Sequence, residues 1–176
     1  MKRKKVVSSG VMMGGFYRVK VVDKDGKVSG DSGYTQNAVT NVGLSQYIAY
    51  AFASAGGSTR LTQPAYMNLG SSSYASSSVS SATNISAGFP LSAGPAVTVT
   101  HITRAASSDG HTVRFTATFI SSNCFTTTCT IACIGLFHTT NATSAMCVGS
   151  FASSTLGSAQ NVNATYDIVF TASVQT

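Results

Sequence analysis

The residues of this chain that could do acid–base or nucleophilic chemistry are few. The chain has 176 residues, with five Asp, no Glu and only three His: His101, His111 and His138. Catalysis by side chains needs a base, an acid or a nucleophile held by partner groups. Serines are abundant, but the G-x-S-x-G turn that exposes a catalytic serine is missing. The sequence therefore predicts a protein that is not an enzyme, with no catalytic residue and no cofactor.

The four cysteines are Cys124, Cys129, Cys133 and Cys147. Their C-x4-C-x3-C spacing with a distant fourth is unlike that of zinc sites, so no metal site is expected. Two interpretations stay open: buried thiols within strands, and a Cys124–Cys129 disulfide that closes a short loop. A cytoplasmic origin disfavours an early disulfide, whereas later release by cell lysis exposes the cysteines to oxidant.

The net charge of +6 lies entirely in the first 27 residues, and the charges of the remaining chain cancel. Residues 1–15 are expected to form a basic N-terminal arm outside the fold, because they lack alternation and have few large apolar groups. The cations of this arm are Lys2, Arg3, Lys4 and Lys5. We expect them to be solvated or to contact a neighbouring subunit, with weak binding to nucleic-acid phosphates as the alternative.

The body of the chain is unusually neutral. Charged residues make up 9% of the sequence, against about a quarter in an ordinary soluble domain. A free monomer normally uses charge to stay soluble. A neutral surface rich in Ser and Thr therefore favours a subunit that is covered by copies of itself or by partners.

The N-terminus carries no expected targeting segment. The basic start is followed by Val6 and Val7 and then directly by Ser8 and Ser9, without the apolar region of a signal peptide. No run approaches the roughly 18 apolar residues of a membrane span. We therefore expect a protein that is made in a cytoplasm and has no membrane partner.

Period-two alternation predicts strands at both ends of the chain. In Phe16–Val22, Tyr17, Val19 and Val21 share one face. The following Asp23–Gly26 segment is expected to be a turn, because a calcium loop would need an acidic residue such as Glu at its end. Toward the C-terminus, short alternating segments separated by turn residues continue to residue 174. The expected core comprises Phe115, Phe119, Ile131, Ile134, Leu136, Ile168 and Phe170.

One helix is expected, over about residues 40–53. Thr40 or Asn41 can cap its start by accepting a hydrogen bond from a backbone N–H. Apolar residues then recur at helical spacing. They are Leu44, Tyr47, Ile48, Ala51 and Phe52. With the strands, this pattern predicts an all-β fold, a jelly-roll-like β-sandwich with one short helix, in which residues 16–176 form a single domain.

The order of several motifs matches a known pattern. A strand, D-G, strand hairpin leads to an N-x-V-T-N-x-G-L helix start, and an I-G-L-F strand comes later. The matching segments are 16–28, 31–34, 37–44, 66–72, 112–119, 130–137 and 166–174. This arrangement resembles a diffuse family of tailed-bacteriophage virion structural proteins, of the tail-fibre-associated or decoration type. The chain departs from the pattern at Cys133, where Glu is usual.

The resemblance implies a structural subunit of a virion that is assembled in the host cytoplasm, with other copies of itself and other virion proteins as partners. Two alternatives stay open. One is a receptor- or glycan-binding module at a fibre tip, which is disfavoured because the expected loops at 70–95 and 152–163 contain only two aromatic residues, Tyr74 and Phe89. The other is a capsid shell protein whose basic arm faces nucleic acid.

Overall fold

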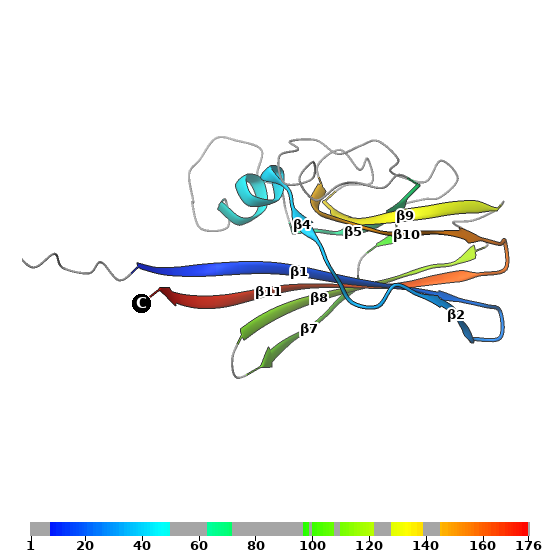
Figure 1. Cartoon of the computed structure of the whole chain (residues 1–176), viewed down its shortest axis with the longest axis horizontal. Coiled ribbons are helices and arrows are strands. Elements are labelled where there is room, and N and C mark those ends of the chain that lie inside the picture. The colour runs from blue at the N-terminus through cyan, green and yellow to red at the C-terminus, as the bar shows by residue number, and fades with distance from the viewer. Residues whose placement is uncertain are drawn as a thin grey trace, which may run out of the picture.

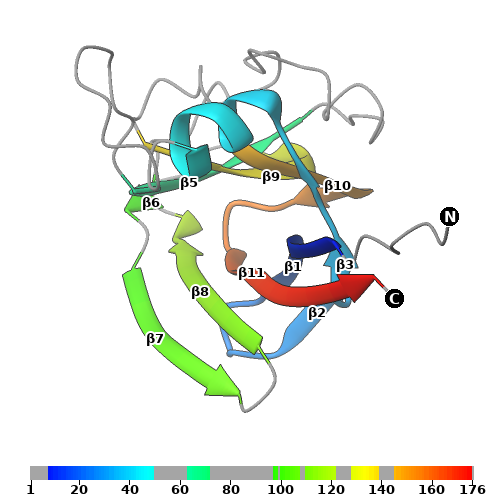
Figure 2. The same ribbon diagram turned by 90° about the vertical axis from the view of Figure 1, so that its left-hand side faces the viewer.

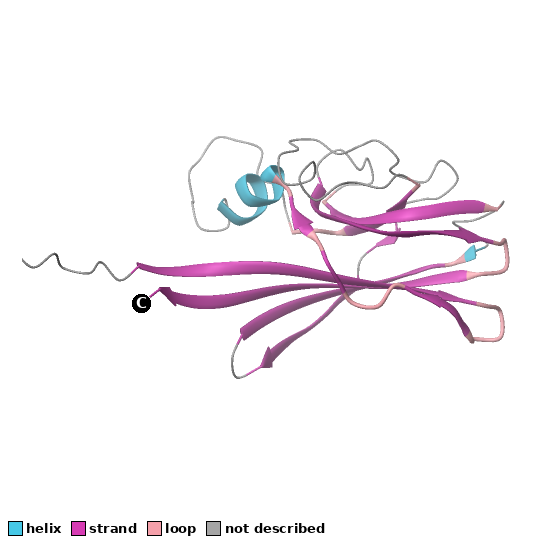
Figure 3. Ribbon diagram, viewed as in Figure 1, coloured by secondary structure: helices cyan, strands magenta, loops and turns pink. Residues whose placement is uncertain are grey.

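In the part of the chain that the structure describes, the protein is a sandwich of two antiparallel β-sheets with the short helix η1 (Gly43–Ala49) at one end (Figure 1, Figure 3). The computed structural model describes residues 8–49, 63–71, 97–98, 100–107, 110–121, 128–138 and 145–175. The sandwich that the sequence predicts is confirmed. The strand order does not establish the finer jelly-roll connectivity. Consecutive strands pair within the same sheet: β7 (Thr100–Ser107) with β8 (Gly110–Phe119) in one sheet, and β9 (Cys129–Phe137) with β10 (Ala145–Leu156) in the other.

The first sheet has the order β2–β1–β11–β8–β7, and β3 also pairs with β1. Its strands are β1 (Ser8–Val22), β2 (Val28–Asp31), β3 (Thr35–Gln36), β7 (Thr100–Ser107), β8 (Gly110–Phe119) and β11 (Asn161–Gln175). The second sheet has the order β4–β10–β9–β5–β6. Its strands are β4 (Ala38–Val39), β5 (Tyr66–Gly70), β6 (Val97–Thr98), β9 (Cys129–Phe137) and β10 (Ala145–Leu156). Figure 2 shows the two layers end-on.

The strand β1 begins earlier than the sequence predicts. It pairs with β11 along its whole length, from Ser8 opposite Gln175 to Val22 opposite Asn161. Residues 8–15 therefore belong to the first sheet, which corrects the expectation that the N-terminal arm extends to residue 15. The physical reason is that backbone hydrogen bonds to β11 need no alternating side chains. Residues 1–7, with the four cations of the arm, lie outside the described residues.

The alternation within β1 and the turn after it are confirmed. Tyr17, Val19 and Val21 are buried between the sheets. In the turn, the Asp23 carboxylate accepts hydrogen bonds from the backbone N–H groups of Asp25 at 3.0 Å and Lys27 at 2.8 Å. Gly26 has a φ of 81°, a conformation that glycine adopts without strain.

The helix differs in type from the expected one. Its regular part, η1 (Gly43–Ala49), is a π-helix, and the Thr40 hydroxyl caps it by accepting from the Gly43 N–H at 2.8 Å. In a π-helix the N–H of residue i+5 donates to the carbonyl of residue i. Val42 and Tyr47 are five residues apart and therefore lie on the same face, where both are buried. Leu44 is instead 49% exposed, which corrects its place on the expected apolar face. Residues 50–53 lie outside the described part of the chain.

Both sheets contribute to one main core. The seven residues expected there lie in it, Phe170 as a partly buried member. Ile131–Phe137 of β9 is buried on both faces, as expected for a central strand. The sequence predicts a loop at 152–163, and the structure corrects this prediction. The strand β10 continues to Leu156 and β11 begins at Asn161, so the turn between them has only four residues. The expected loop at 70–95 falls almost wholly outside the described residues.

Replacing the fully packed Phe119 tests the strand phase. Phe119 is 2% exposed, and Phe119→Ala should lower the free energy of unfolding by about 3–5 kcal/mol because it leaves a cavity. The adjacent Ile120 is 46% exposed, and Ile120→Ala should change stability by less than about 0.5 kcal/mol. Urea denaturation measures both. Equal effects of the two substitutions would contradict the phase of β8.

Two nested deletions test where the N-terminal arm ends. Deleting residues 2–7 should move the melting temperature by less than about 2 °C. Deleting residues 2–13 also removes the six pairs from Ser8–Gln175 to Met13–Phe170, and should lower it by more than about 5 °C. Calorimetry of both proteins gives the answer. If the longer deletion is as harmless as the shorter one, residues 8–13 contribute nothing to the sheet.

Candidate assembly face

The outer face of the first sheet is a surface of hydroxyl groups. Alternate residues of β8 and β11 point away from the core, and threonine is the commonest residue type among them. Thr116 lies directly opposite Thr165 across the two strands. Among the described elements, none packs on this side of the sheet (Figure 1, Figure 2). We call this surface the threonine face; its threonines are Thr112, Thr116, Thr118, Thr165 and Thr171.

One ion pair lies at the centre of the threonine face. Arg114 on β8 binds Asp167 on β11 through two hydrogen bonds, Nε to Oδ1 at 2.7 Å and Nη2 to Oδ2 at 2.8 Å. Asp167 is only 6% exposed. The hydrogen bonds to Asp167 raise the pKa of the Arg114 guanidinium. Because both charges are neutralised within the sheet, a partner that covers this face would not need to supply a counter-charge.

A second ion pair lies near the β2 edge of the same sheet. Arg18 of β1 binds Asp31 of β2 through Nε to Oδ1 at 2.9 Å and Nη2 to Oδ2 at 2.5 Å. The Gly33 N–H donates to the same carboxylate at 2.9 Å. The Arg18 guanidinium also lies 5.5 Å from the centre of the Tyr34 ring. The hydrogen bonds from Arg18, above all, lower the pKa of Asp31 to about 2.

Apolar side chains are exposed at the β1 side of the threonine face. Met12 is 60% exposed and Phe16 is 38% exposed, and both belong to the outward-facing set of β1. They lie opposite Thr171 and Asp167 of β11. Exposed apolar groups next to uncharged polar ones are typical of the centre of a protein interface. The face thus combines apolar contact with neutral hydrogen-bonding groups.

The buried titratable groups are held neutral by their surroundings. Burial raises the pKa values of Tyr17 and Tyr166, and raises that of the Cys147 thiol to about 12. The Tyr47 hydroxyl lies 3.3 Å from Nδ1 of His138. Burial lowers the pKa of the His138 imidazole. These shifts favour neutral forms at physiological pH, so the groups serve the packing of the core.

The residues singled out in the sequence do not form one cluster in the described structure. Lys2, Arg3, Lys4 and Lys5 lie outside the described residues, as does Cys124. Cys129 is a free thiol and is partly buried, so the Cys124–Cys129 disulfide stays a prediction for oxidising conditions.

The other cysteines and histidines are also dispersed. Cys133 and Cys147 are fully buried in β9 and β10. His101 and His111 lie on β7 and β8, and their side chains are not described. Within the described ranges, no three His, Cys, Asp or Glu side chains are grouped as a metal would require. No described helix is long and apolar enough to span a membrane.

The threonine face and its ion pair were not predicted from the sequence. The signal was present, because Thr112, Thr116 and Thr118 alternate with the core residues of β8, and Asp167 alternates with those of β11. The pairing of β8 with β11 brings these two rows together, and it joins residues about fifty positions apart.

Comparisons of the chain with family models, curated proteins and solved structures find no match.

The Arg18–Asp31 pair predicts a specific pH response. The pKa of Asp31 is lowered from 3.8 to about 2 in the folded protein. Its contribution to stability is therefore present above pH 3.8 and is lost as the pH falls through 2. Arg18→Gln should return the carboxyl titration, followed by NMR, toward 3.8. Arg114→Gln is the control and should leave Asp31 unchanged; an unchanged midpoint in Arg18→Gln would contradict the assignment.

Proposed function

We propose that this protein is a non-enzymatic structural subunit of a phage-like virion, a decoration or tail-associated protein. It acts by associating with copies of itself and by packing on other virion proteins, after assembly in the host cytoplasm. The observation that carries the proposal is the threonine face: an uncovered sheet surface whose Arg114–Asp167 charges already neutralise each other. The motif order in the sequence supports a virion protein independently of this surface.

The chemistry of the threonine face favours association with a flat, neutral partner. A contact on this surface desolvates hydroxyls, which can exchange hydrogen bonds with a partner, and few unpaired charges. Met12 and Phe16 add exposed apolar area beside it. A second copy of the chain presents the same threonines and the same closed Arg114–Asp167 pair, so self-association brings no unpaired charge of β8 or β11 into contact there.

The basic residues at the N-terminus favour a second, weaker role. Lys2–Lys5 are four adjacent cations immediately before the sheet begins at Ser8. Their chemistry suits phosphate groups of packaged nucleic acid, with binding that falls steeply with salt. A capsid shell protein would use such an arm inside the particle, whereas a decoration or tail protein would use it against a neighbour. Copy number per particle separates these locations.

A charge placed on the threonine face tests the proposal. The purified protein should form an oligomer by light scattering at micromolar concentration. Thr116→Lys places a cation at the centre of the face and should weaken association at least tenfold, since each buried unpaired charge is strongly unfavourable. Thr155→Lys is the matched control, because Thr155 is an exposed strand residue of β10 on the other sheet.

Two results would contradict the assembly role. One is a wild-type protein that stays monomeric and does not associate with particles. The other is equal loss of association in Thr116→Lys and Thr155→Lys, which would place the interface elsewhere. Melting temperatures of both variants show whether each keeps its fold.

A further inference from the structure

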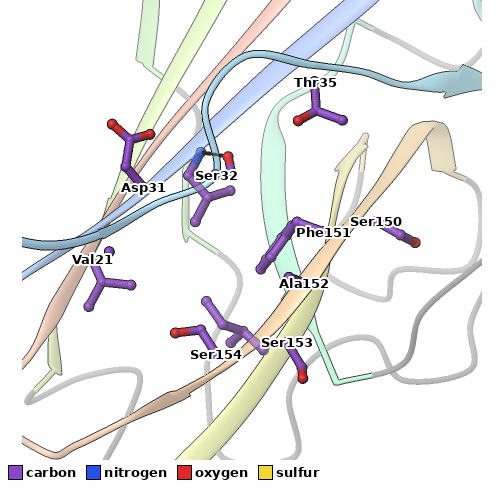
Figure 4. A pocket seen from close by; sticks show the side chains of 12 residues that line it. Val21, Asp31, Ser32, Thr35, Ser150, Phe151, Ala152, Ser153 and Ser154 are labelled. Atoms are coloured by element: carbon purple, nitrogen blue, oxygen red, sulfur yellow. Dashed lines mark hydrogen bonds between the residues drawn. The ribbon is translucent and has the colours of Figure 1, made fainter.

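A cavity of about 520 Å³ opens between the two sheets, away from the threonine face. Val19 and Val21 of β1 and Ile131 of β9 form its apolar part. Figure 4 shows Ser32 and Thr35 on the chain that follows β2, facing residues of β10 across the opening. Its volume lies within the range of about 300–1,000 Å³ that is usual for small-molecule sites.

One wall of the cavity is an irregular stretch of β10. Ser150 pairs with Cys133 and Ser154 pairs with Ile131, so four steps along β10 match only two along β9. The two extra residues form a β-bulge, which takes backbone N–H and C=O groups out of the regular ladder. Such bulges occur next to binding sites because they redirect side chains and backbone groups.

The bulge also brings two serine hydroxyls to the cavity. Ser153 is exposed and Ser154 is partly buried, and both line the opening. Within the described part of the chain, neither hydroxyl has a hydrogen-bond partner. Ser32 differs, because its Oγ accepts from the Val19 N–H at 2.9 Å and donates to the Gly33 carbonyl at 2.8 Å. Two hydroxyls available to a ligand, those of Ser153 and Ser154, therefore lie on the β10 wall.

An aromatic ring completes the site, and the lining residue Asp31 turns its carboxylate away from the opening (Figure 4). Phe151 is partly buried, lines the cavity (Figure 4) and lies with its ring centre 6.2 Å from that of Tyr17. Asp31 also lines the cavity, but its carboxylate is held by Arg18. The opening thus offers an apolar ring, free hydroxyls and no unpaired charge among its lining residues. This combination disfavours an ionic ligand.

We propose that this cavity binds a neutral saccharide unit. A sugar ring has apolar C–H faces that suit the Phe151 ring and several hydroxyls that can exchange hydrogen bonds with Ser153, Ser154 and the bulged backbone. The site lies between the sheets, whereas a fibre-tip module would present aromatic side chains on its loops. Saccharide binding is therefore separate from assembly through the threonine face.

NMR titration of the isotope-labelled protein tests this proposal. The probes are glucose, galactose, mannose and N-acetylglucosamine, with glucosamine and glucuronate as charged counterparts and glycerol as a simple polyol. At least one neutral sugar should shift the amide signals of Ser32, Phe151 and Ser153 with a dissociation constant in the range of about 1–10 mM. The charged sugars and glycerol should bind more weakly.

A pair of variants locates the binding. The double variant Ser153→Ala with Ser154→Ala should weaken binding about tenfold, since two hydrogen bonds to the ligand are lost. Ser158→Ala is the matched control, because Ser158 is an exposed serine of the β10–β11 turn that does not line the cavity. It should bind like the wild type.

Three results would overturn the proposal: no shift with any neutral sugar, shifts that map outside the cavity, or equal binding by the double variant and the wild type. Tighter binding of glucuronate or glucosamine would overturn the assignment of a neutral ligand. The wild-type shift map decides the location of the site even if a variant loses stability. None of these outcomes bears on oligomer formation, which is measured separately.

Discussion

Two buried tyrosines tie the sheets of this sandwich together, and the rest of the structure depends on them. Tyr17 of β1 and Tyr166 of β11 are fully buried with their rings 6.0 Å apart. Tyr17 donates its hydroxyl proton to the Ser150 carbonyl of the opposite sheet, and Asn37, just before β4, donates to the Tyr166 hydroxyl. A buried hydroxyl without a partner is costly, so these bonds favour one alignment of the two layers. A Cβ at position 149 would overlap the Tyr17 ring, which explains Gly149 there.

This arrangement separates the tasks of the two faces of the first sheet. The inner face carries the large apolar residues and the tyrosines, and the outer face carries threonines around one closed ion pair. The core residues of this sheet lie on its inner face, so the outer face need not supply large apolar side chains. The same separation leaves β10 free to bulge where it faces β1 and β2. The proposed saccharide site uses that irregularity, whereas the proposed assembly role uses the regular sheet.

Much of the fold could be predicted because side-chain alternation is a local property. The inward residues of β1, β8, β9 and β11 follow from their spacing, and so do the Asp23 turn and the Thr40 cap. The predictions from sequence are wrong where side-chain spacing does not determine the backbone structure. Residues 8–15 contain Gly10, Gly14 and Gly15 and show no alternation, yet their backbone pairs with β11. Leu44 is exposed because a π-helix places different residues on one face than an α-helix does.

By itself, the sequence determined the all-β class, the strand phase, most of the core and the neutrality of the body, because these depend on composition and on neighbours within a few residues. Tertiary structure alone decided which strands pair, and with them the Arg114–Asp167 ion pair, the hydroxyl bonds of the tyrosines and the cavity. Each of these joins segments that are distant along the chain: Tyr17 and its partner Ser150 are 133 residues apart. Contacts at such a separation leave no periodic signal, because either residue alone fits many environments.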